Sequence, residues 1–294
     1  MIKKIFLSLG LLLLLGTAQS QDLSDLFKDQ PKKKDFVGYT FKSTRIVNFH
    51  TIETQGKRTL DFRISHRFGF LSSGPNNFWG LDGSADIRLG LEYSITDRLQ
   101  VGIGRTSSHK VVDGFVKYRI LRQTTDNSMP VSVTGLAISD LITEKVNTDA
   151  NGFNKYHYFT DRFCYVYQLM IARKFNEKLS LQVSPTLVHY NIVDTLGDKN
   201  DIYGLVVMGR YKLSKRFALT AEYCFRLNKY VQSFSSYNGC FAFGFDLETG
   251  GHVFQIHFTN SLGIDEAHSI PFTTGNPLKG DLRLGFNISR AFWL

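Results

Sequence analysis

The chain has 294 residues, of which 43% are hydrophobic and 14% aromatic, and its formal net charge is +9 at pH 7. A mean hydropathy of -0.14 argues against a helical membrane protein, because each spanning helix needs about 20 consecutive apolar residues. The chain has 6 prolines, 25 glycines, 25 phenylalanines and 13 tyrosines, a balance typical of long paired strands. This length fits either two small domains or one large all-β domain.

The first twenty residues are typical of an export signal. Two lysines are followed by a short apolar run at residues 5–15 and by a small-x-small cleavage site at 18–20. The apolar run is too short to serve comfortably as a membrane anchor. No cysteine follows it, which argues against a lipoprotein. We therefore predict a signal peptide at residues 1–20 that is cleaved before Gln21.

Residues 21–43 are polar and rich in lysine, without any periodicity. We predict that they form a periplasmic lead-in to the folded domain. The positive charge of an exported chain indicates attraction to lipid head groups and lipopolysaccharide rather than to nucleic acid. The lysine run at residues 32–34 itself fits a solvated charge surplus.

From residue 44 onward, apolar and polar residues alternate in steps of two. In residues 85–93 (ADIRLGLEY), Ala, Ile, Leu, Leu and Tyr share one face, and Asp, Arg, Gly and Glu share the other. Sustained alternation predicts strands with one apolar face. The predicted strands are residues 44–52, 58–67, 84–95, 98–106, 111–121, 131–139, 161–173, 178–190, 202–213, 217–227, 238–248, 251–260 and 281–294.

The connections between these strands alternate in length. Short turns near residues 96–97, 175–177, 213–215 and 249–251, and a longer one at 123–130, alternate with long polar loops around 69–83, 140–160, 191–201, 229–237 and 261–280. In outer-membrane barrels, short turns face the periplasm and long loops face outside. We therefore predict an all-β fold, a transmembrane antiparallel β-barrel over residues 44–294 in the bacterial outer membrane.

Thirteen predicted strands conflict with the even number found in single-chain bacterial barrels. If both ends lie in the periplasm, the twelve strands from residue 58 to 294 close the barrel. Residues 44–52 would then be a segment that precedes the barrel and enters its lumen. A fourteenth strand near residues 36–42 is the alternative, so we expect about 12 strands, or else 14.

A soluble β-sandwich would also alternate, but two features favour the membrane barrel. Sandwich strands are usually about five or six residues long, whereas many runs here approach the ten or so that cross a membrane with tilt. The polar faces also carry opposite charges two to six residues apart, which suits a water-poor lumen in which each charge needs a partner. These sets are Asp61/Arg63, Asp86/Arg88/Glu92, Asp113/Lys117/Arg119 and Glu222/Arg226.

The polar phase of the strands predicts which residues line the lumen. They are Arg63, Arg67, Asp86, Arg88, Glu92, Lys117, Arg119, Glu222, Arg226, Asp246 and Arg283. These side chains form either a charged pore that tunes selectivity or a salt-bridge core that closes a narrow barrel. About twelve strands enclose a lumen between the filled eight-stranded and the open sixteen-stranded case, and the density of bulky charges slightly favours the closed core.

The last strand ends LRLGFNISRAFWL, with its apolar side chains on one face. We predict that five of its residues anchor the closing strand in the membrane, the last three at the periplasmic interface. They are Phe286, Ile288, Phe292, Trp293 and Leu294.

No group of residues in the sequence predicts catalysis, a metal ion or a cofactor. Eight histidines are scattered without ligand spacing on one inward face, and neither C-x-x-C nor G-x-S-x-G occurs. Gly102-Ile103-Gly104 lies within a strand, which indicates close packing or a bulge. Cys224 and Cys240 lie on neighbouring strands, but simple pairing across their hairpin puts them diagonally, which disfavours a disulfide.

Several stretches resemble an uncharacterised outer-membrane β-barrel family found mainly in Bacteroidota-type bacteria. They are RTLDFRISHRFGF (58–70), FWGLDGSADIRLGLEYSITDRLQVGIGR (78–105), DGFVKYRILRQ (113–123) and GNPLKGDLRLGFNISRAFWL (275–294). The resemblance covers most of the chain after residue 44 and implies an exported barrel of unknown function with no catalytic residues to transfer. Many outer-membrane barrels end on Phe, whereas this chain ends on Leu294.

The resulting hypothesis is a non-enzymatic outer-membrane barrel that is a narrow channel or transporter for small solutes. The alternative is a structural or accessory barrel subunit of a larger outer-membrane complex. A lipid-modifying enzyme is disfavoured, because Ser65 and His66, adjacent on one strand, point to opposite faces. The expected partners are outer-membrane lipid and lipopolysaccharide, the barrel-insertion machinery and other outer-membrane proteins, with no nucleic acid and no cofactor.

Overall fold

The computed structural model describes residues 35–145, 155–193, 197–228 and 237–294. The chain divides into two units, Met1–Asp35 and Phe36–Leu294, and the barrel lies in the second. The predicted signal peptide, residues 1–20, lies outside the described residues, as does most of the predicted lead-in.

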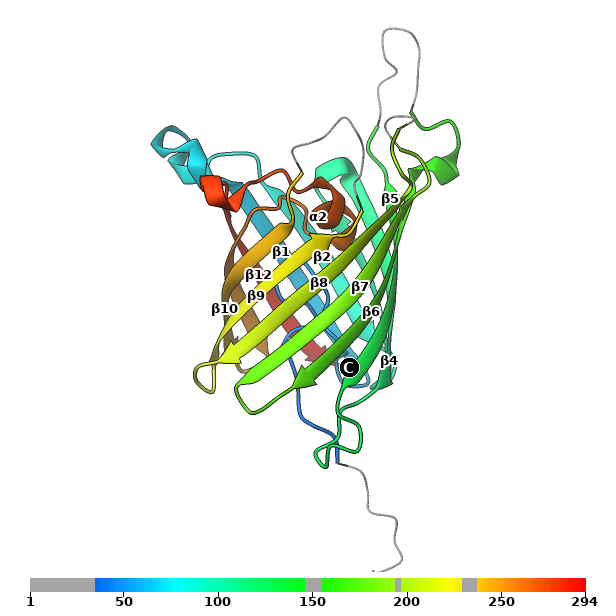
Figure 1. Cartoon of the computed structure of the whole chain (residues 1–294), viewed down its shortest axis with the longest axis vertical. Helices are drawn as coiled ribbons and strands as arrows, with labels where there is room; N and C mark the ends of the chain where they lie inside the picture. Colours follow the sequence, from blue (N-terminus) through cyan, green and yellow to red (C-terminus); the bar gives the residue numbers. More distant parts are fainter. Residues whose placement is uncertain (1–34, 146–154, 194–196, 229–236) are drawn as a thin grey trace, which may run out of the picture. The chain divides into compact units, whose positions relative to one another are not determined.

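The described residues form twelve antiparallel strands that close into a barrel, in which each strand pairs with its neighbours in the chain and β1 pairs with β12 (Figure 1). The predicted number of twelve is confirmed, and the alternative of fourteen is wrong. The strands are β1 (Thr59–Phe70), β2 (Asp86–Ser94), β3 (Leu99–Thr106), β4 (Val111–Leu121), β5 (Ser132–Ile142), β6 (Phe163–Lys174), β7 (Leu179–Tyr190), β8 (Asp201–Lys212), β9 (Phe217–Arg226), β10 (Cys240–Thr249), β11 (His252–Thr259) and β12 (Arg283–Trp293).

The helical elements of the described residues are short and lie in the connections. They are α2 (Glu266–Phe272) and the 3-10 turns Leu71–Ser73, Pro75–Gly80, Ser108–Lys110, Phe159–Arg162 and Pro277–Lys279. Among the described residues, no helix is long and apolar enough to cross a membrane.

The two ends of the barrel differ in the length of their connections, as predicted. At one end, which we call the turn rim, the strands are joined mostly by tight turns, and β10–β11 needs only Gly250 and Gly251. Both glycines have positive φ, +42° and +111°, a backbone conformation that other residues rarely adopt. The other end, the loop rim, carries the long connections, except that β3–β4 is joined by residues 107–110 alone. The C-terminus lies at the turn rim (Figure 1).

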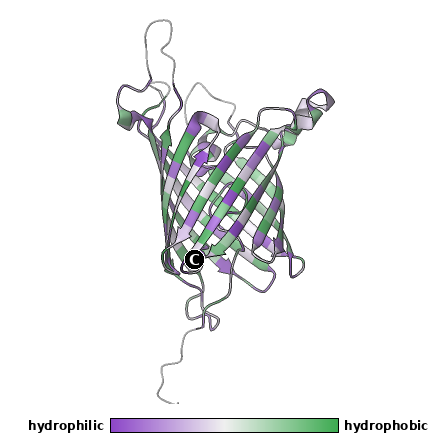
Figure 2. Ribbon diagram, turned by 180° about the vertical axis from the view of Figure 1, so that it is seen from behind, coloured by the Kyte–Doolittle hydropathy of each residue, from purple (hydrophilic) through white to green (hydrophobic). Residues whose placement is uncertain are grey.

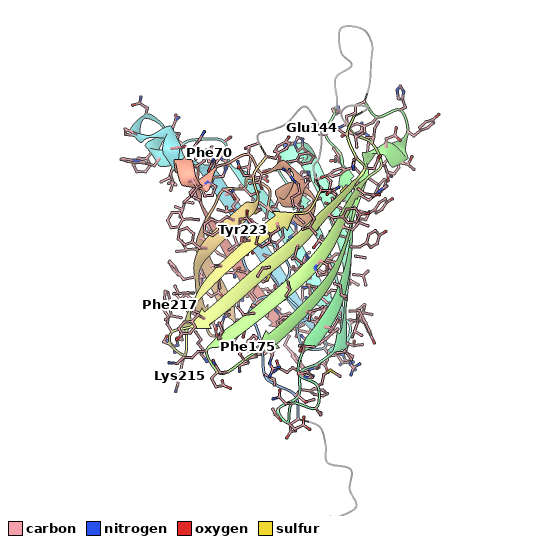
Figure 3. All side chains as sticks on the ribbon, in the orientation of Figure 1. Phe70, Glu144, Phe175, Lys215, Phe217 and Tyr223 are labelled. Carbon is pink, nitrogen blue, oxygen red and sulfur yellow. The ribbon has the colours of Figure 1, made fainter. Side chains whose placement is uncertain are left out.

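Side chains alternate between the outside and the inside of the barrel along each strand. In β2, for example, Leu89 and Leu91 are 49% and 45% exposed, whereas Arg88 and Glu92 are fully buried. Hydrophobic and hydrophilic residues accordingly alternate along the strands in Figure 2. Phe217 and Tyr223 lie on the outer wall in Figure 3, while Phe175 and Lys215 lie at the turn rim. The outer face is therefore an apolar belt of the kind that contacts lipid.

Replacing Leu89 by Arg should reduce the free energy of unfolding in lipid by about 2–4 kcal/mol, because it puts a charge on the outer face near mid-strand. Denaturant titration of the protein folded in lipid vesicles measures this loss. Ile95→Arg, on an outward side chain at the turn rim, is the control and should cost only about 0–1 kcal/mol near the interface. Equal costs at the two sites would contradict the membrane position of the belt.

Residues 44–52 are not part of the wall but lie in the lumen, as predicted for a barrel closed by the twelve strands from residue 58 to 294. Residues 40–54, which we call the plug, lie inside the barrel and are buried except for Lys42. The plug folds back on itself at its tip, where Ile46 N donates to Phe49 O at 3.1 Å. All of its apolar residues are buried in one internal cluster, as suits a segment that the wall surrounds rather than a strand with one lipid face.

The plug starts and ends at the turn rim. Just before the plug, Val37 N donates to Gln123 O in the β4–β5 connection at 2.9 Å. At the end of the plug, Thr54 Oγ1 donates to Asp97 O in the β2–β3 turn at 2.8 Å. Its tip reaches towards the loop rim, where Arg45 pairs with Glu266 of α2 at 3.3 Å. The plug therefore extends from the turn rim to the β11–β12 connection at the loop rim, which its tip contacts.

The inner wall has two chemically different sides, which the alternation did not predict. β1 and β2 each point three charged side chains inward, whereas the inward side chains of β6 and β8 are largely apolar, including Val166, Met170 and Val206. The plug presents Phe49 and Ile52 to the same buried apolar cluster. β6 and β8, two strands without predicted lumen charges, thus form an apolar inner side, because the plug supplies apolar surface inside the lumen for the wall to bury.

Candidate functional site: the plugged lumen

The eleven residues predicted to line the lumen all have their side chains on the inner side of the strands. Ten of them are at most 8% exposed, and Arg226 is half-buried near the loop rim. The ten buried residues are Arg63, Arg67, Asp86, Arg88, Glu92, Lys117, Arg119, Glu222, Asp246 and Arg283.

The sequence suggested partners two to six residues along the same strand, but most of these charges do not pair in that way. Asp61 and Arg63 do so, at 3.2 Å. Arg88, however, donates from Nε to Asp113 Oδ1 at 2.8 Å and from Nη2 to Asp113 Oδ2 at 2.5 Å, reaching across β3 to β4. Inward side chains of different strands meet inside a narrow barrel, so spacing along one strand is a poor guide to which charges pair.

Several predicted charges instead hold the plug. Glu222 accepts hydrogen bonds from the backbone N–H groups of Val47 and Asn48, at 3.1 and 2.8 Å. Lys117 Nζ donates to the backbone carbonyls of Thr44 and Glu53, at 3.3 and 3.2 Å. The wall charges thus form hydrogen bonds with backbone N–H and C=O groups of the plug, which strand pairing does not satisfy.

Uncharged polar residues of the wall also hold the plug, and they were not among the residues predicted to line the lumen. Gln182 accepts from Ile52 N at 2.8 Å and donates to His50 O at 2.9 Å. Asn287 donates to Val47 O at 3.1 Å. Both lie at inward positions of the predicted strands, so the same alternation could have found them had it not been restricted to charged residues.

Two glycines leave room for the Arg88 guanidinium. A Cβ atom added to Gly104 would lie 2.3 Å from Arg88 Nη2, and one added to Gly90 would lie 2.6 Å from Nη1. Gly102 does the same for the ring of Phe115, at 2.3 Å. The glycines of Gly102-Ile103-Gly104 therefore allow close packing, one of the two alternatives predicted from the sequence, and not a bulge.

Gly104→Ala should destabilise the barrel by about 1–3 kcal/mol, because the added methyl group forces the clamped guanidinium to move. Gly114→Ala is the control on the neighbouring strand, since a Cβ there would meet only the Gly102 carbonyl at 3.9 Å. Unfolding titrations of the two variants in the same vesicles give the comparison. A loss no larger for Gly104 than for Gly114 would contradict the packing role.

A cavity of about 430 Å³ lies at the loop rim. Its lining includes Asp86, His109, Glu144, Asp265 and His268. We call it the vestibule. It is rich in carboxylates, so it favours cations over anions.

Asp265 and His268 form an ion pair on the β11–β12 connection. Asp265 Oδ1 lies 2.7 Å from His268 Nδ1 and accepts from the backbone N of His268 at 2.8 Å. Burial opposes protonation of the ring, but the Asp265 carboxylate outweighs it and raises the pKa of His268 to about 9. Burial likewise opposes ionisation of Asp265, yet the adjacent imidazolium lowers the pKa of Asp265 to about 2.

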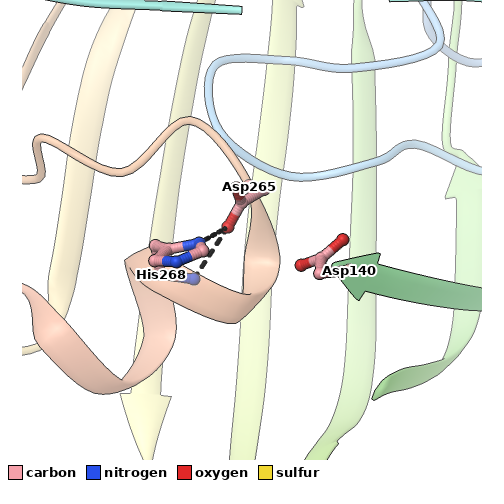
Figure 4. A group of neighbouring side chains, drawn as sticks. All are labelled: Asp140, Asp265 and His268. Atoms are coloured by element: carbon pink, nitrogen blue, oxygen red, sulfur yellow. Dashed lines mark hydrogen bonds and ion pairs between the residues drawn. The ribbon is translucent and has the colours of Figure 1, made fainter. Parts of the chain in front are cut away.

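Asp140, from β5, approaches this pair, and the three side chains lie together in Figure 4. One donor atom from each residue lies within 4.8 Å of the others. This group was not predicted from the sequence, because Asp140 is remote in the chain from the other two. The i, i+3 spacing of Asp265 and His268 was the one feature of the sequence that indicated part of this group.

The five predicted anchor residues, four on β12 and Leu294 just after it, fall into two groups. Phe286 and Ile288 lie on the outer face of β12, and Phe286 stacks on His66 of β1 with ring centroids 5.1 Å apart. Phe292, Trp293 and Leu294 are exposed at the turn rim, and Trp293 follows the inward phase at the end of the strand.

The register of β9 and β10 corrects the expectation for the cysteines. Cys224 lies directly opposite Cys240 rather than diagonally. The β9–β10 connection is long, so the alternation of faces, and not a tight turn, sets this register. In the described part of the chain, all three cysteines are free thiols.

A closed barrel of twelve strands with an apolar outer belt defines the chain as a membrane β-barrel protein. Residues 41–292 match a family model described as a membrane bound beta barrel domain (DUF5777). The chain belongs to this family, which confirms the resemblance to a barrel family without an assigned function. No curated protein sequence matches the chain.

Solved structures of other barrels are similar to this chain at low identity. A KdgM porin is 10% identical with a TM-score of 0.48, covering 80% of this chain and 99% of its own. The COG4313 outer membrane channel from Pseudomonas putida F1 is 15% identical with a TM-score of 0.46, covering 82% and 97%. LpxR from Salmonella typhimurium is 11% identical with a TM-score of 0.35, covering 80% and 100%. At these values the likeness does not extend to function.

Proposed function

We propose that the protein is a non-enzymatic outer-membrane barrel that acts as a narrow channel or transporter for small solutes and is gated by its plug. The observation that carries this proposal is how the lumen is filled. The plug is held by side chains of the wall, through hydrogen bonds such as those of Glu222, Lys117 and Gln182, and not by strand pairing. If the plug withdraws, water can satisfy the same polar side chains, and an open lumen remains.

The orientation follows from the lengths of the connections. Short turns face the periplasm in outer-membrane barrels, so we place the turn rim there and the vestibule outside. The plug then enters the lumen from the periplasm, continuous with the predicted lead-in at residues 21–43. The apolar belt contacts outer-membrane lipid, the rims contact lipopolysaccharide and other envelope proteins, and Phe292, Trp293 and Leu294 lie at the periplasmic interface.

A second function, a structural or accessory barrel that stays closed, is favoured by the ion pairs that hold the plug near its two ends. Arg45 of the tip pairs with Glu266 at 3.3 Å, and Glu53 near the turn rim pairs with Arg119 at 2.8 Å. All four side chains are at most 10% exposed. Breaking buried pairs of this kind is costly, so a permanent plug is consistent with them.

A reversible lock on the plug distinguishes the two functions. Asn48 Nδ2 lies 3.4 Å from Cys240 Sγ, so Asn48→Cys in a Cys224→Ser background should form a disulfide between plug and wall. We expect the reduced protein to show discrete openings in planar bilayers and the oxidised protein to show none. Openings that persist in the oxidised protein would exclude gating by plug withdrawal. Silence in both states, and in the unmodified protein, would favour the permanently closed barrel.

A further inference from the structure

The carboxylate of Asp140 is buried without a partner. Asp140 is 1% exposed, and neither of its oxygens accepts a hydrogen bond from any described residue. Its cross-strand neighbour on β4 is Asp113, whose own carboxylate is occupied by Arg88. Isolated buried carboxylates are costly unless a positive charge or donors compensate them.

The free oxygens of Asp140 face further uncompensated acceptors. Asp265 uses only Oδ1 in its pair with His268, and Asp265 Oδ2 has no partner among the described residues. Asp86 on the vestibule wall likewise has an unpartnered Oδ2. The neighbouring Glu266 is already paired with Arg45 of the plug. The carboxylates of Asp140 and Asp265 thus lie beside one histidine ring, with Asp86 also on the vestibule wall, and the group is short of positive charge.

We propose that Asp140, Asp265 and His268 bind a divalent transition-metal ion at the floor of the vestibule. The donor atoms lie within 4.8 Å of one another, close enough to converge on one ion after small rotations (Figure 4). Two carboxylate oxygens and one imidazole nitrogen match the preference of zinc and neighbouring metals for mixed nitrogen and oxygen ligands. Calcium and magnesium prefer sites built from oxygen alone.

The position of the group provides access and a preformed geometry. Asp265 and His268 line the vestibule cavity of about 430 Å³, so a hydrated ion can reach them from the loop rim and keep water as its remaining ligands. The 2.7 Å contact between Asp265 and His268 already orients both side chains. Binding requires a neutral imidazole and ionised carboxylates, so protons are released as the metal enters.

The test is direct metal binding by the full chain purified in detergent and stripped with a chelator. We expect titration of Zn²⁺ against a chromophoric chelator to give one ion per chain. Asp140→Asn and His268→Gln should each weaken Zn²⁺ binding at least about tenfold, because even outer-shell changes cost about 10–100-fold. Circular dichroism establishes that each variant is folded, and the conservative Asp140→Asn change keeps the size of the side chain.

The matched control is the exposed pair of His189 and Asp201, whose Nδ1–Oδ1 distance is also 2.7 Å. The double variant His189→Gln/Asp201→Asn should bind Zn²⁺ as the unmodified chain does. No Zn²⁺ binding by the unmodified chain, or equal affinity in the Asp140 and His268 variants, would overturn the proposal. Displacement of Zn²⁺ by equimolar Ca²⁺ would overturn the assignment to a transition metal. This readout is binding alone, so it is independent of whether the barrel conducts.

Discussion

A chain that begins at Lys57, and therefore lacks the plug, should conduct far more than the full chain in planar bilayers. The strand ladders close without the plug, from Thr59 of β1 to Trp293 of β12, so the barrel can still form. A lumen of about twelve strands lies between the filled and the open barrels, so emptying it should raise conductance by roughly an order of magnitude or more.

The matched control is a chain that begins at Asp35, which loses the preceding residues but keeps the plug. It should conduct as the full chain does, because residues 40–54 still fill the lumen. Circular dichroism of both shortened chains in vesicles tests whether each barrel has formed. If a folded barrel without the plug remained silent, then the wall would close the lumen unaided, and the plug could not be the gate.

Replacing Arg88 by Met should reduce the free energy of unfolding by about 3–5 kcal/mol, the usual cost of removing one partner of a buried ion pair. Arg88 is fully buried and donates two hydrogen bonds to Asp113. Without it, Asp113 remains buried and faces Asp140, its direct neighbour across the β4–β5 ladder. The loss should therefore come from the stranded carboxylate. Denaturant titration in vesicles measures it.

Two further variants separate the stranded charge from lost packing. Arg88→Met/Asp113→Leu removes both charges and should recover most of the stability, since apolar replacements of a buried pair are often neutral. Arg105→Met alters an exposed arginine on β3 and should change the free energy of unfolding by no more than about 0.5 kcal/mol. A double variant as unstable as Arg88→Met would show that packing of the arginine, rather than its charge, stabilises the wall.

The alternation of residues predicted the twelve wall strands and their two faces, and the lengths of the connections predicted the two rims. A side chain on a strand points to one face or the other, so Leu89 outward and Arg88 inward can be deduced from parity alone. The even number of strands and the position of both ends then reduced thirteen candidates to twelve.

Partners inside the lumen were not predictable in this way. Residues 44–52 alternate well enough to be taken for a strand, but their apolar side chains all join one cluster buried inside the barrel. Arg88 pairs with Asp113 two strands away and not with Asp86 or Glu92. These choices depend on which side chains meet across a closed barrel, and closure is set by all twelve strands together.

The vestibule group depends on the tertiary structure in the same way. Asp265 and His268 lie on a connection whose path over the lumen no periodic pattern describes, and only that path brings them to Asp140. The strand pattern by itself determined that this chain is a membrane barrel. It also determined which side chains point inward, because each strand in the wall has one face that contacts lipid and must be apolar. Which inward side chains meet, what holds the plug and where carboxylates gather were decided by closure of the barrel, because closure brings residues distant in the chain within reach of one another.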